Sequence, residues 1–395
     1  MGKDLKGREL GKGISQRKNG AYEARYIDPY GIRRSIYTTD LKEAKKKLLD
    51  KLYEKEHHIS VKNDKMTLDE WYHKWMDVYK RNSIKRSSII CYNNVYNNYI
   101  ASELGKFPLI SITKIQIQKL INNMYDNGYS WAVQDKVKRL LTDMYGRAIE
   151  DEFAIRNPVK GIRLKGEKGS YKVLTKEEQK MFFETAAGTF YENLFIVAVN
   201  TGLRSAELFA LTRDDIDFDK KVIHVRHNLN YFKYEGDEQK TFHWETPKTK
   251  NSLRDVPINS ICEEYLKRQL RLKNRLSIKF PNNSEFSKVI FVSALNNPLN
   301  TSLYHEAIKR IVDMRNELLD DIEKMECFGG HTFRHTFATR CIEAGVKPKT
   351  LQDYLGHATL QMTMDLYVHT MEETKQDEIK LLEDTTIDMY KFNIV

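Results

Sequence analysis

Two short polar stretches divide the chain into three segments with different hydrophobic patterns. The first, HHISVKNDK at 57–65, is polar, and the second, KGEKGSYK at 165–172, is rich in glycine and lysine, as linkers often are. At 395 residues the chain is also longer than most single domains. The sequence therefore predicts an α+β protein with three domains, at residues 1–62, 66–163 and 172–395.

The N-terminal segment has the alternating pattern of short β-strands. Ala24 lies between the polar Glu23 and Arg25, and a tyrosine stands two positions away on each side. Such alternation places one set of side chains on each face of a strand. The dipeptide Asn19-Gly20 and the sequence DPYG at 28–31 predict turns, because Asn and Gly tolerate positive φ. Residues 13–38 are therefore expected to form three strands.

A single helix is expected to follow these strands. Asp40 precedes it with Glu43 three positions on, which is the spacing of an N-terminal capping box. The apolar stripe of this helix consists of Leu41, Ala44, Leu48, Leu49 and Leu52. The segment thus predicts a small three-stranded sheet backed by one helix, with a thin core.

Basic and aromatic residues are concentrated in this predicted sheet. We expect a surface around Tyr22, Tyr26 and Tyr30 that presents five cations, namely Arg17, Lys18, Arg25, Arg33 and Arg34. A small sheet can enter the major groove of DNA, so DNA contact is one interpretation. The alternative is a basic sheet that interacts only with solvent.

The middle segment has helical periodicity. Thr67 and Glu70 form a capping box, and Trp71, Trp75 and Val78 give a helical stripe. Further helices are expected near 87–101, 113–127 and 130–152, which makes this an all-helical domain. Helix-surface cations mostly serve solubility, but five are candidate phosphate contacts: Lys85, Arg86, Lys136, Lys138 and Arg139.

Charge and cysteine usage limit the class of protein. The formal net charge is +10; residues 1–62 hold 16 Lys+Arg against 9 Asp+Glu, whereas residues 371–395 hold 3 Lys against 7 Asp+Glu. The excess of positive charge in residues 1–62 favours a polyanionic partner. No run of 18 apolar residues predicts a membrane span, the first residues lack the apolar core of a signal peptide, and the four cysteines lack CxxC spacing. These features favour a cytoplasmic protein with reduced thiols.

The C-terminal segment contains an arginine at an unusual place. Thr175 and Glu178 form a capping box at its start, and an apolar helix then ends at Thr201-Gly202. Arg204 follows at once, beside a long apolar run. Because an unpaired buried guanidinium is costly, Arg204 must meet an anion, and Glu207 three residues later is the local candidate.

Two further stretches contain candidate functional residues that are basic or aromatic. Taken alone, each of these residues could equally serve solubility or core packing. Lys248 lies at the predicted turn of a hairpin, KTKN at 248–251, whose outgoing strand is SLRDVPI, and an exposed lysine there suggests solubility. In LQDYLGHATLQMTMDLYVHT, Gly356 breaks a helix just before His357. Tyr367 lies ten residues further along, on an apolar helical stripe that suggests a place in the core.

A third stretch, GGHTFRHTFATRCIEAGV, offers both an active-site and a metal-site interpretation. His331 and Arg334 would share one helix face. His335 lies four residues from His331, with Cys327 nearby, which is a spacing compatible with zinc. A zinc site needs a third protein ligand and a supporting carboxylate. Because the neighbouring residues supply neither, a packing or hydrogen-bonding role for His335 at the base of the domain is favoured.

Taken together, these residues suit one chemical task. Two arginines, a lysine and two histidines around a tyrosine match the needs of attack on a phosphodiester. Arginine binds phosphate oxygens in bidentate fashion, fixed donors stabilise the developing charge, and a tyrosine helped by its neighbours can act as a nucleophile.

The blocks TGLRSAEL, PKTKNSLRDVPI, HTFRHTFAT and LGHATLQMTMDLY closely resemble the tyrosine recombinase (integrase) family. The catalytic resemblance covers roughly residues 170–370. The segment 66–160 resembles the family's core-site-binding domain. The first sixty residues resemble, most weakly, the arm-type-binding sheet of integrases from temperate phages and conjugative transposons. The resemblance implies a mainly helical catalytic domain with a small antiparallel sheet.

The resemblance also implies roles for the residues of the four blocks. Arg204 and Arg334 would clamp the scissile phosphate, His331 would share that clamp and help to move the tyrosine proton, and His357 would bind a non-bridging oxygen. Tyr367 would form a 3′-phosphotyrosine.

The remaining roles fall to a lysine and a glutamate. Lys248, or Lys250 as the alternative, would protonate the departing 5′-hydroxyl. Glu207 would support the cluster. Neither a metal nor another cofactor is needed for this chemistry, because side chains supply the positive charge.

The expected partners follow from the same resemblance. The protein would bind double-stranded DNA at core and arm sites and act as a homotetramer through a Holliday junction. An accessory excision factor or a host DNA-bending protein would be a further partner. The acidic tail 371–395 would dock in cis or in trans. The sequence also leaves two alternatives: a DNA-relaxing enzyme of the type IB topoisomerase kind, and a non-catalytic regulator derived from an integrase.

Overall fold

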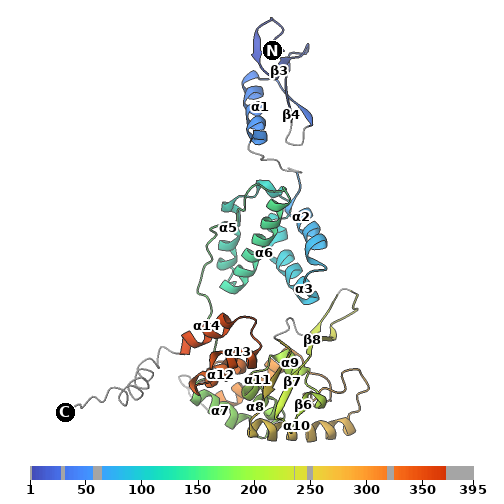
Figure 1. The fold of residues 1–395 in the computed structure, drawn as a ribbon, viewed down its shortest axis with the longest axis vertical. Coiled ribbons are helices and arrows are strands. Elements are labelled where there is room, and N and C mark those ends of the chain that lie inside the picture. The colour runs from blue at the N-terminus through green and yellow to red at the C-terminus, as the bar shows by residue number, and fades with distance from the viewer. Residues whose placement is uncertain are drawn as a thin grey trace, which may run out of the picture. The chain divides into compact units, whose positions relative to one another are not determined.

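The computed structural model describes residues 2–27, 32–56, 65–234, 236–246, 252–317 and 324–370. By its internal contacts the chain divides into two compact units, Met1–Gly169 and Ser170–Val395. The architecture mixes helices with small antiparallel sheets, which confirms the predicted α+β class (Figure 1). None of the described helices combines the length and apolar character needed to cross a bilayer.

The predicted three-stranded sheet is present at the N-terminus. Its strands β3 (Ile14–Gln16), β4 (Tyr22–Ile27) and β5 (Arg33–Thr38) pair antiparallel in that order. Two shorter strands that the sequence did not predict, β1 (Gly2–Lys3) and β2 (Glu9–Gly11), pair with each other. The helix α1 (Leu41–Glu56) begins after Asp40, whose carboxylate accepts from the backbone N–H of Glu43 at 3.3 Å.

The core of this sheet is small, and the helix stripe is narrower than predicted. Leu10, Ile14, Ala24 and Leu48 are buried together. Leu49 and Leu52, which the sequence placed in the stripe, are 70% and 46% exposed. Among the described residues, the sheet packs on one side of α1, so the outer leucines remain largely exposed.

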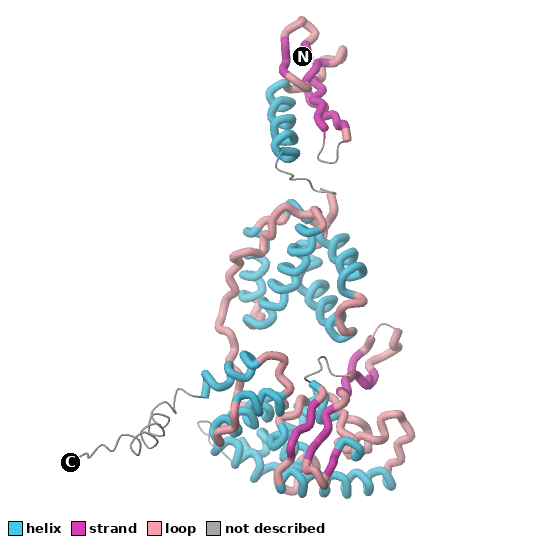
Figure 2. Tube along the Cα trace, viewed as in Figure 1, coloured by secondary structure: helices cyan, strands magenta, loops and turns pink. Residues whose placement is uncertain are grey.

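The middle of the chain is helical, as predicted, and its described residues 66–163 form no β-sheet (Figure 2). Its α-helices are α2 (Leu68–Trp75), α3 (Arg86–Val95), α4 (Ala101–Leu104), α5 (Lys114–Asp126) and α6 (Trp131–Glu150). The capping box of Thr67 and Glu70 is confirmed by reciprocal hydrogen bonds of 3.2 and 2.9 Å.

One predicted core position of this segment is wrong. Trp71 and Trp75 are fully buried, but Val78 is 62% exposed. The reason is a π-helical turn at Met76–Lys80, closed by a hydrogen bond from the N–H of Arg81 to the carbonyl of Met76. The wider turn changes the angular spacing of residues, so Val78 does not continue the stripe.

The second unit is mainly helical around a small sheet. Its helices are α7 (Lys176–Ala186), α8 (Glu192–Thr201), α9 (Ser205–Phe209), α10 (Ser260–Lys279), α11 (Thr301–Asn316), α12 (His331–Glu343), α13 (Pro348–Leu355) and α14 (Leu360–Thr370). A large core gathers side chains from most of these elements, including Phe182, Phe195 and Phe333. The capping box of Thr175 and Glu178 at the start of α7 is confirmed.

The strands of this unit form two sheets, and their pairing corrects one prediction. β10 (Arg254–Pro257), β7 (Val222–Val225) and β6 (Ile216–Asp217) form one sheet in that order, while β8 (Asn228–Phe232) pairs with β9 (Thr241–Glu245) in another. The sequence predicted a hairpin with its turn at 248–251. The described strands on either side of that turn belong to different sheets, since β9 pairs with β8 and β10 pairs with β7.

Candidate active site

Arg204 lies at a tight junction between α8 and α9, as the sequence predicted. Gly202 ends α8 in the left-handed conformation, with φ of 60°. A Cβ atom at this position would lie 2.4 Å from the Cδ1 atom of Phe337, so the close approach of α12 requires glycine. Arg204 then occupies the N-cap position of α9, where its guanidinium bonds Glu207 at 2.7 Å. The predicted local pair of Arg204 and Glu207 is confirmed.

A second arginine, which the sequence analysis missed, holds the same carboxylate. Arg254 at the start of β10 bonds both oxygens of Glu207 through Nη1 and Nη2, at 3.0 and 2.9 Å. Burial by itself would raise the pKa of Glu207, but Arg254 and then Arg204 outweigh this effect and lower the pKa to about 2. The only signal in the sequence was a basic residue inside the predicted strand SLRDVPI.

Three arginines converge on the C-terminal end of α13. Arg254 Nε donates to the carbonyl of Tyr354 at 2.6 Å, Arg334 Nη2 to that of Leu355 at 2.6 Å, and Arg204 Nη2 to that of Gly356 at 3.2 Å. The last carbonyls of a helix lack partners within the helix and carry partial negative charge. The arginines therefore satisfy these carbonyls, and this fixes the end of α13 beside the cluster.

Arg334 is the most deeply enclosed of the predicted catalytic residues that the structure describes. Its side chain lies on α12 and is 4% exposed, with Nη1 donating to the carbonyl of Gly202 at 2.7 Å. Burial and the nearby charge of Arg204 lower the pKa of Arg334 to about 9, so it remains a cation at neutral pH. The guanidinium groups of Arg334 and Arg204, both predicted from the sequence, therefore lie in one cluster.

The two predicted histidines lie beside these arginines. His357 follows the end of α13, is 8% exposed, and bonds the hydroxyl of Thr363 through Nδ1 at 2.9 Å. Burial and then the charges of Arg334 and Arg204 lower the pKa of His357 to about 4. His331 begins α12, and desolvation followed by the same two arginines lowers its pKa, although part of the side chain still reaches solvent.

His335 packs against other rings, which is one of the two roles that the sequence favoured for it. Its ring lies 4.6 Å from the ring of Tyr171 and 5.3 Å from that of His331, measured between centroids. Desolvation, and then interactions with His331 and Arg334, lower the pKa of His335 to about 4. Within the described ranges, no three His, Cys, Asp or Glu residues gather in the manner of a metal site.

Tyr367 lies on α14 but its hydroxyl does not face the arginines. The side chain is 6% exposed and packs in a small core with Ile342, Leu351 and Leu355. Its hydroxyl donates to the backbone carbonyl of Val346. Burial, and to a lesser degree Cys341, raise the pKa of Tyr367. In this conformation the tyrosine occupies the apolar position that its helical stripe suggested.

Lys248 and its alternative Lys250 lie outside the described residues, as do Tyr30 and the acidic tail 371–395. The described chain reaches Thr246 on one side of these lysines and resumes at Ser252 on the other. The strand that follows, β10, carries Arg254 into the cluster.

The basic residues predicted for the N-terminal sheet are split between its faces. Arg34 pairs with Tyr26, on the face that packs against α1, whereas Arg33 pairs with Ile27 on the opposite, open face. Successive residues of a strand point to opposite sides, so adjacent arginines could not share a surface with the tyrosines. The open face instead has Glu23 at its centre, bonded by Arg17 at 3.2 Å and by Arg25 at 3.0 Å.

The candidate cations of the helical segment differ in their availability. Lys136, Arg86 and Arg139 are exposed, and Arg139 pairs with Asp135 at 2.7 Å. Lys85 is half-buried. Lys138 donates to the backbone carbonyl of Ile162 at 2.9 Å, which gives it a structural role.

Comparisons with known proteins show which family has this architecture. The model of the phage integrase family matches residues 172–374. The chain belongs to this family. A phage integrase N-terminal SAM-like domain matches residues 67–125, and the DNA-binding domain of Tn916 integrase matches residues 1–63. Family membership makes the chain a tyrosine-type site-specific recombinase, as the four sequence blocks predicted.

Relatives of similar length support this assignment. The transposase from transposon Tn1545 of Streptococcus agalactiae and that from Tn916 of Enterococcus faecalis are each 30% identical to this chain, over 96% of both sequences. A XerC-like tyrosine recombinase of Caldanaerobacter subterraneus is 30% identical over 90% of this chain and 93% of its own length.

Two solved structures share the fold. The Tn1549 transposon integrase in complex with transposon right end DNA has a TM-score of 0.70 at 23% identity, covering 80% of this chain and 100% of the other. A lambda integrase tetramer bound to a Holliday junction has a TM-score of 0.54 at 19% identity, covering 91% and 95%.

Proposed function

We propose that this recombinase integrates and excises a mobile DNA element by cutting and rejoining DNA strands through a 3′-phosphotyrosine and a Holliday junction. The observation that carries the proposal is the cluster at the end of α13. There Arg204 and Arg334 lie together, with His357 and His331 beside them. This arrangement concentrates positive charge where a phosphate can bind.

Arg204 and Arg334 would clamp the scissile phosphate. Each is already oriented by backbone carbonyls, and Glu207 fixes Arg204 further. A guanidinium has five N–H donors, so the bonds to the protein leave others for phosphate oxygens. Donors that are fixed before the reaction stabilise the transition state without having to reorganise.

The histidines would act at the same phosphate. Thr363 occupies Nδ1 of His357, which leaves Nε2 for a non-bridging oxygen. The lowered pKa values keep His357 and His331 neutral at pH 7. Each neutral ring therefore has one N–H group that can donate and one ring nitrogen that can accept a proton. His331 would share the clamp and help to take the tyrosine proton.

The covalent step would exchange one ester for another. The oxygen of Tyr367 attacks the phosphorus, a bond to the 3′-phosphate forms, and the 5′-oxygen leaves with a proton from Lys248, or from Lys250. A 5′-hydroxyl of the partner strand then reverses the reaction and releases the tyrosine. The protein–DNA ester conserves the energy of the cleaved phosphodiester bond, so no nucleoside triphosphate is consumed.

Tyr367 must leave its observed position for this step. Its hydroxyl is bonded to Val346 and sits in an apolar cluster that raises its pKa. Movement of α14 would bring the hydroxyl to the arginines, where positive charge would lower the pKa again. Binding of DNA would thus couple assembly of the site to its activation.

The partners of this function would be DNA and further copies of the chain. Solved relatives are bound to transposon end DNA and, as a tetramer, to a Holliday junction. We propose that this chain likewise binds core sites through residues 66–163 and 172–395, binds arm sites through residues 1–62, and assembles as a homotetramer. Candidate DNA contacts are Arg17, Lys18, Arg25, Arg33, Lys85, Arg86, Lys136 and Arg139. The tail 371–395 would dock in cis or in trans, and an accessory excision factor or a host DNA-bending protein would assist.

The test is Tyr367→Phe, with Tyr231→Phe as the matched control because Tyr231 lies on β8 and packs its ring at a tilt against Phe242. On a nicked suicide substrate, Tyr367→Phe should bind DNA but form no SDS-resistant adduct, while Tyr231→Phe should form as much adduct as the parent chain. Adducts that persist in Tyr367→Phe would contradict the assignment. Relaxation of plasmids that lack paired sites, without recombination, would favour a topoisomerase instead.

A further inference from the structure

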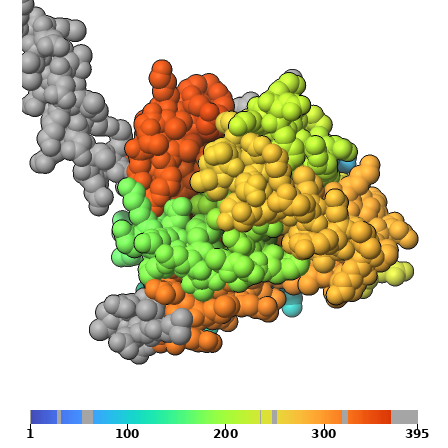
Figure 3. Space-filling view, turned by 90° about the horizontal axis from the view of Figure 1, so that it is seen from below, coloured from blue at the N-terminus to red at the C-terminus, as the bar shows by residue number. Residues whose placement is uncertain are grey.

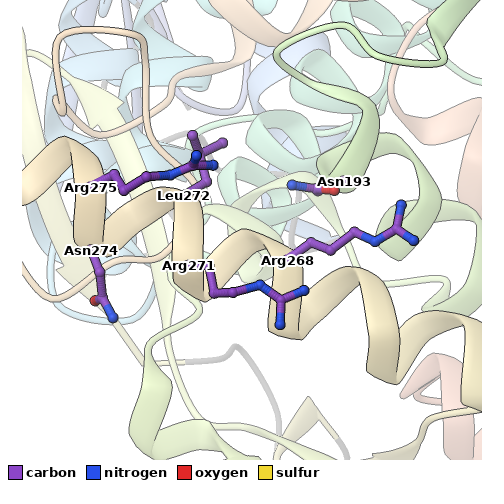
Figure 4. A pocket seen from close by; sticks show the side chains of 6 residues that line it. All are labelled: Asn193, Arg268, Arg271, Leu272, Asn274 and Arg275. Carbon is purple, nitrogen blue, oxygen red and sulfur yellow. The ribbon is translucent and has the colours of Figure 1, made fainter.

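A hollow lined by arginines lies on the second unit, away from the α13 cluster. Its volume is about 610 Å³ and it opens to solvent between α8 and α10. The lining consists of Asn193, Arg268, Arg271, Leu272, Asn274 and Arg275. Figure 4 shows the three arginines extending from one helix, α10, and Asn193 standing on the neighbouring helix, α8.

The spacing of these arginines places them along one face of α10. Arg271 lies three residues after Arg268, and Arg275 lies four residues after Arg271, so their side chains neighbour one another. All three are exposed. At a rise of 1.5 Å per residue, the run from Arg268 to Arg275 spans about 10.5 Å. Phosphates of one DNA strand advance by about 3.4 Å along the axis, so the run covers about three of them.

The acidic neighbour of this row holds it only weakly. Glu264 bonds Arg268 at 2.9 Å and lies 3.7 Å from Arg271. The side chains of Glu264 and Arg268 are each 49% exposed, and exposed ion pairs of this kind contribute little to stability. A phosphate could therefore replace the carboxylate with little loss of stability.

The chemistry of the lining suits a nucleic-acid backbone better than a protein. Leucine is the only apolar residue among the six, whereas the centres of protein interfaces are rich in aromatic and apolar side chains. Arginine matches the geometry of phosphate oxygens, and the amides of Asn193 and Asn274 add further donors. The open shape also fits an extended strand rather than an enclosed small molecule.

The position of the hollow separates it from the DNA that is cut. Within the second unit, α10 runs along the side opposite α13 and α14 (Figure 1). Figure 3 views the unit from the side on which α10 lies. One straight duplex bound at the α13 cluster would not reach this side as well.

We propose that the α10 arginine hollow is a second DNA-contacting surface, which binds the backbone of a duplex other than the one being cleaved. The inference rests on the proposed function, since it presumes that the α13 cluster holds the cleaved duplex. In a recombining complex, this surface would hold DNA outside the core site against the catalytic units. Its contacts are to phosphates, so it adds affinity without sequence preference.

The experiment compares two full-length triple variants that lose the same charge. One carries Arg268→Gln, Arg271→Gln and Arg275→Gln. The control carries Lys176→Gln, Lys180→Gln and Lys220→Gln, which are exposed residues elsewhere on the same unit. Each protein is first trapped on a short nicked core duplex and then titrated with a labelled duplex that has no core site, at several salt concentrations.

The arginine variant should capture the second duplex roughly tenfold more weakly near 0.1 M salt. The slope of the logarithm of its affinity for the second duplex against the logarithm of the salt concentration, here called the salt slope, should also become shallower. The decrease should be up to about 2.7, because each phosphate contact contributes about 0.9. The control should change both quantities far less, and all proteins should form equal amounts of covalent adduct on the core duplex.

Equal capture and equal salt slopes in the two variants would overturn the proposal. So would a loss of oligomer assembly in the arginine variant with normal capture of DNA, because this would make the hollow a protein interface. A failure of every protein to form adducts would instead count against the proposed function. The second-duplex titration would then be run on untrapped protein, so the two ideas fail separately.

Discussion

Glu207 in the second unit and Glu23 in the N-terminal sheet invite comparison. Each carboxylate is almost fully enclosed, at 3% and 4% exposure, and each is held by two arginines. Hydrogen bonds from Arg25 and Arg17 lower the pKa of Glu23 to about 2, and Arg254 and Arg204 do the same for Glu207 against the effect of burial.

The two sites differ in how their arginines are held. Arg254 has a side chain 6% exposed and is also bonded to backbone carbonyls, whereas the side chains of Arg17 and Arg25 are 50% and 69% exposed. An arginine that is buried with several fixed partners keeps one geometry, as a reaction centre requires. Exposed arginines can exchange a carboxylate for a phosphate, as a DNA-binding face requires.

The largest expected effect comes from breaking the buried pair. Arg254→Met should destabilise the second unit by roughly 3–5 kcal/mol, because it leaves Glu207 as a buried charge with one partner fewer. Covalent adduct formation should fall as well, since the end of α13 loses a donor. Hydrogen exchange followed by mass spectrometry reports the stability of each unit separately.

The matched variant in the other region is Arg25→Met. It should destabilise the N-terminal sheet far less than Arg254→Met destabilises the second unit, as expected for an exposed pair. If the two variants had equal effects on stability, burial would not be what distinguishes the two sites.

An intermediate effect is expected from pH. Folding lowers the pKa values of His331, His335 and His357, the last two to about 4. The unfolded chain therefore binds more protons than the folded one below pH 6.5, so the second unit loses stability as the pH falls from 6.5 to 4. Each unit of pKa shift corresponds to about 1.4 kcal/mol.

The N-terminal sheet should not respond in that window, because residues 1–56 contain no histidine. Glu23 and Glu207 stabilise their regions above pH 4.5, and this contribution is lost only as the pH falls toward 2. Hydrogen exchange corrected for intrinsic rates, measured between pH 7 and 4, would test the contrast. Parallel losses in both regions would argue against it.

The smallest effect is expected from Glu23→Gln. Without the central carboxylate, Arg17 and Arg25 are free for phosphates, so affinity for arm-site DNA should rise modestly. The salt slope should steepen by about 1. Glu9→Gln is the control, because it changes the charge equally at an exposed position on β2. An unchanged salt slope in Glu23→Gln would indicate that the open face does not contact DNA.

Much of the local structure followed from short stretches of sequence. The capping boxes at Thr67 and Thr175, the glycine end of α8 and the pair of Arg204 with Glu207 were all predicted. Each depends on groups three or four residues apart, whose distance is set by the helix itself. The predictions that Leu49 and Val78 belong to apolar stripes were wrong, because local periodicity reveals neither what covers a helix nor where a π-helical turn changes the spacing.

The sequence by itself determined the family, the four blocks and the residues in them that suit phosphate chemistry. Only the tertiary structure decided how these residues meet. Arg254 reaches Glu207 across 47 positions, Arg334 reaches Gly202 across 132, and Arg204 reaches Gly356 across 152. The structure also placed the hydroxyl of Tyr367 on Val346, away from the arginines. Such contacts depend on how whole helices pack, and no spacing along the chain encodes them.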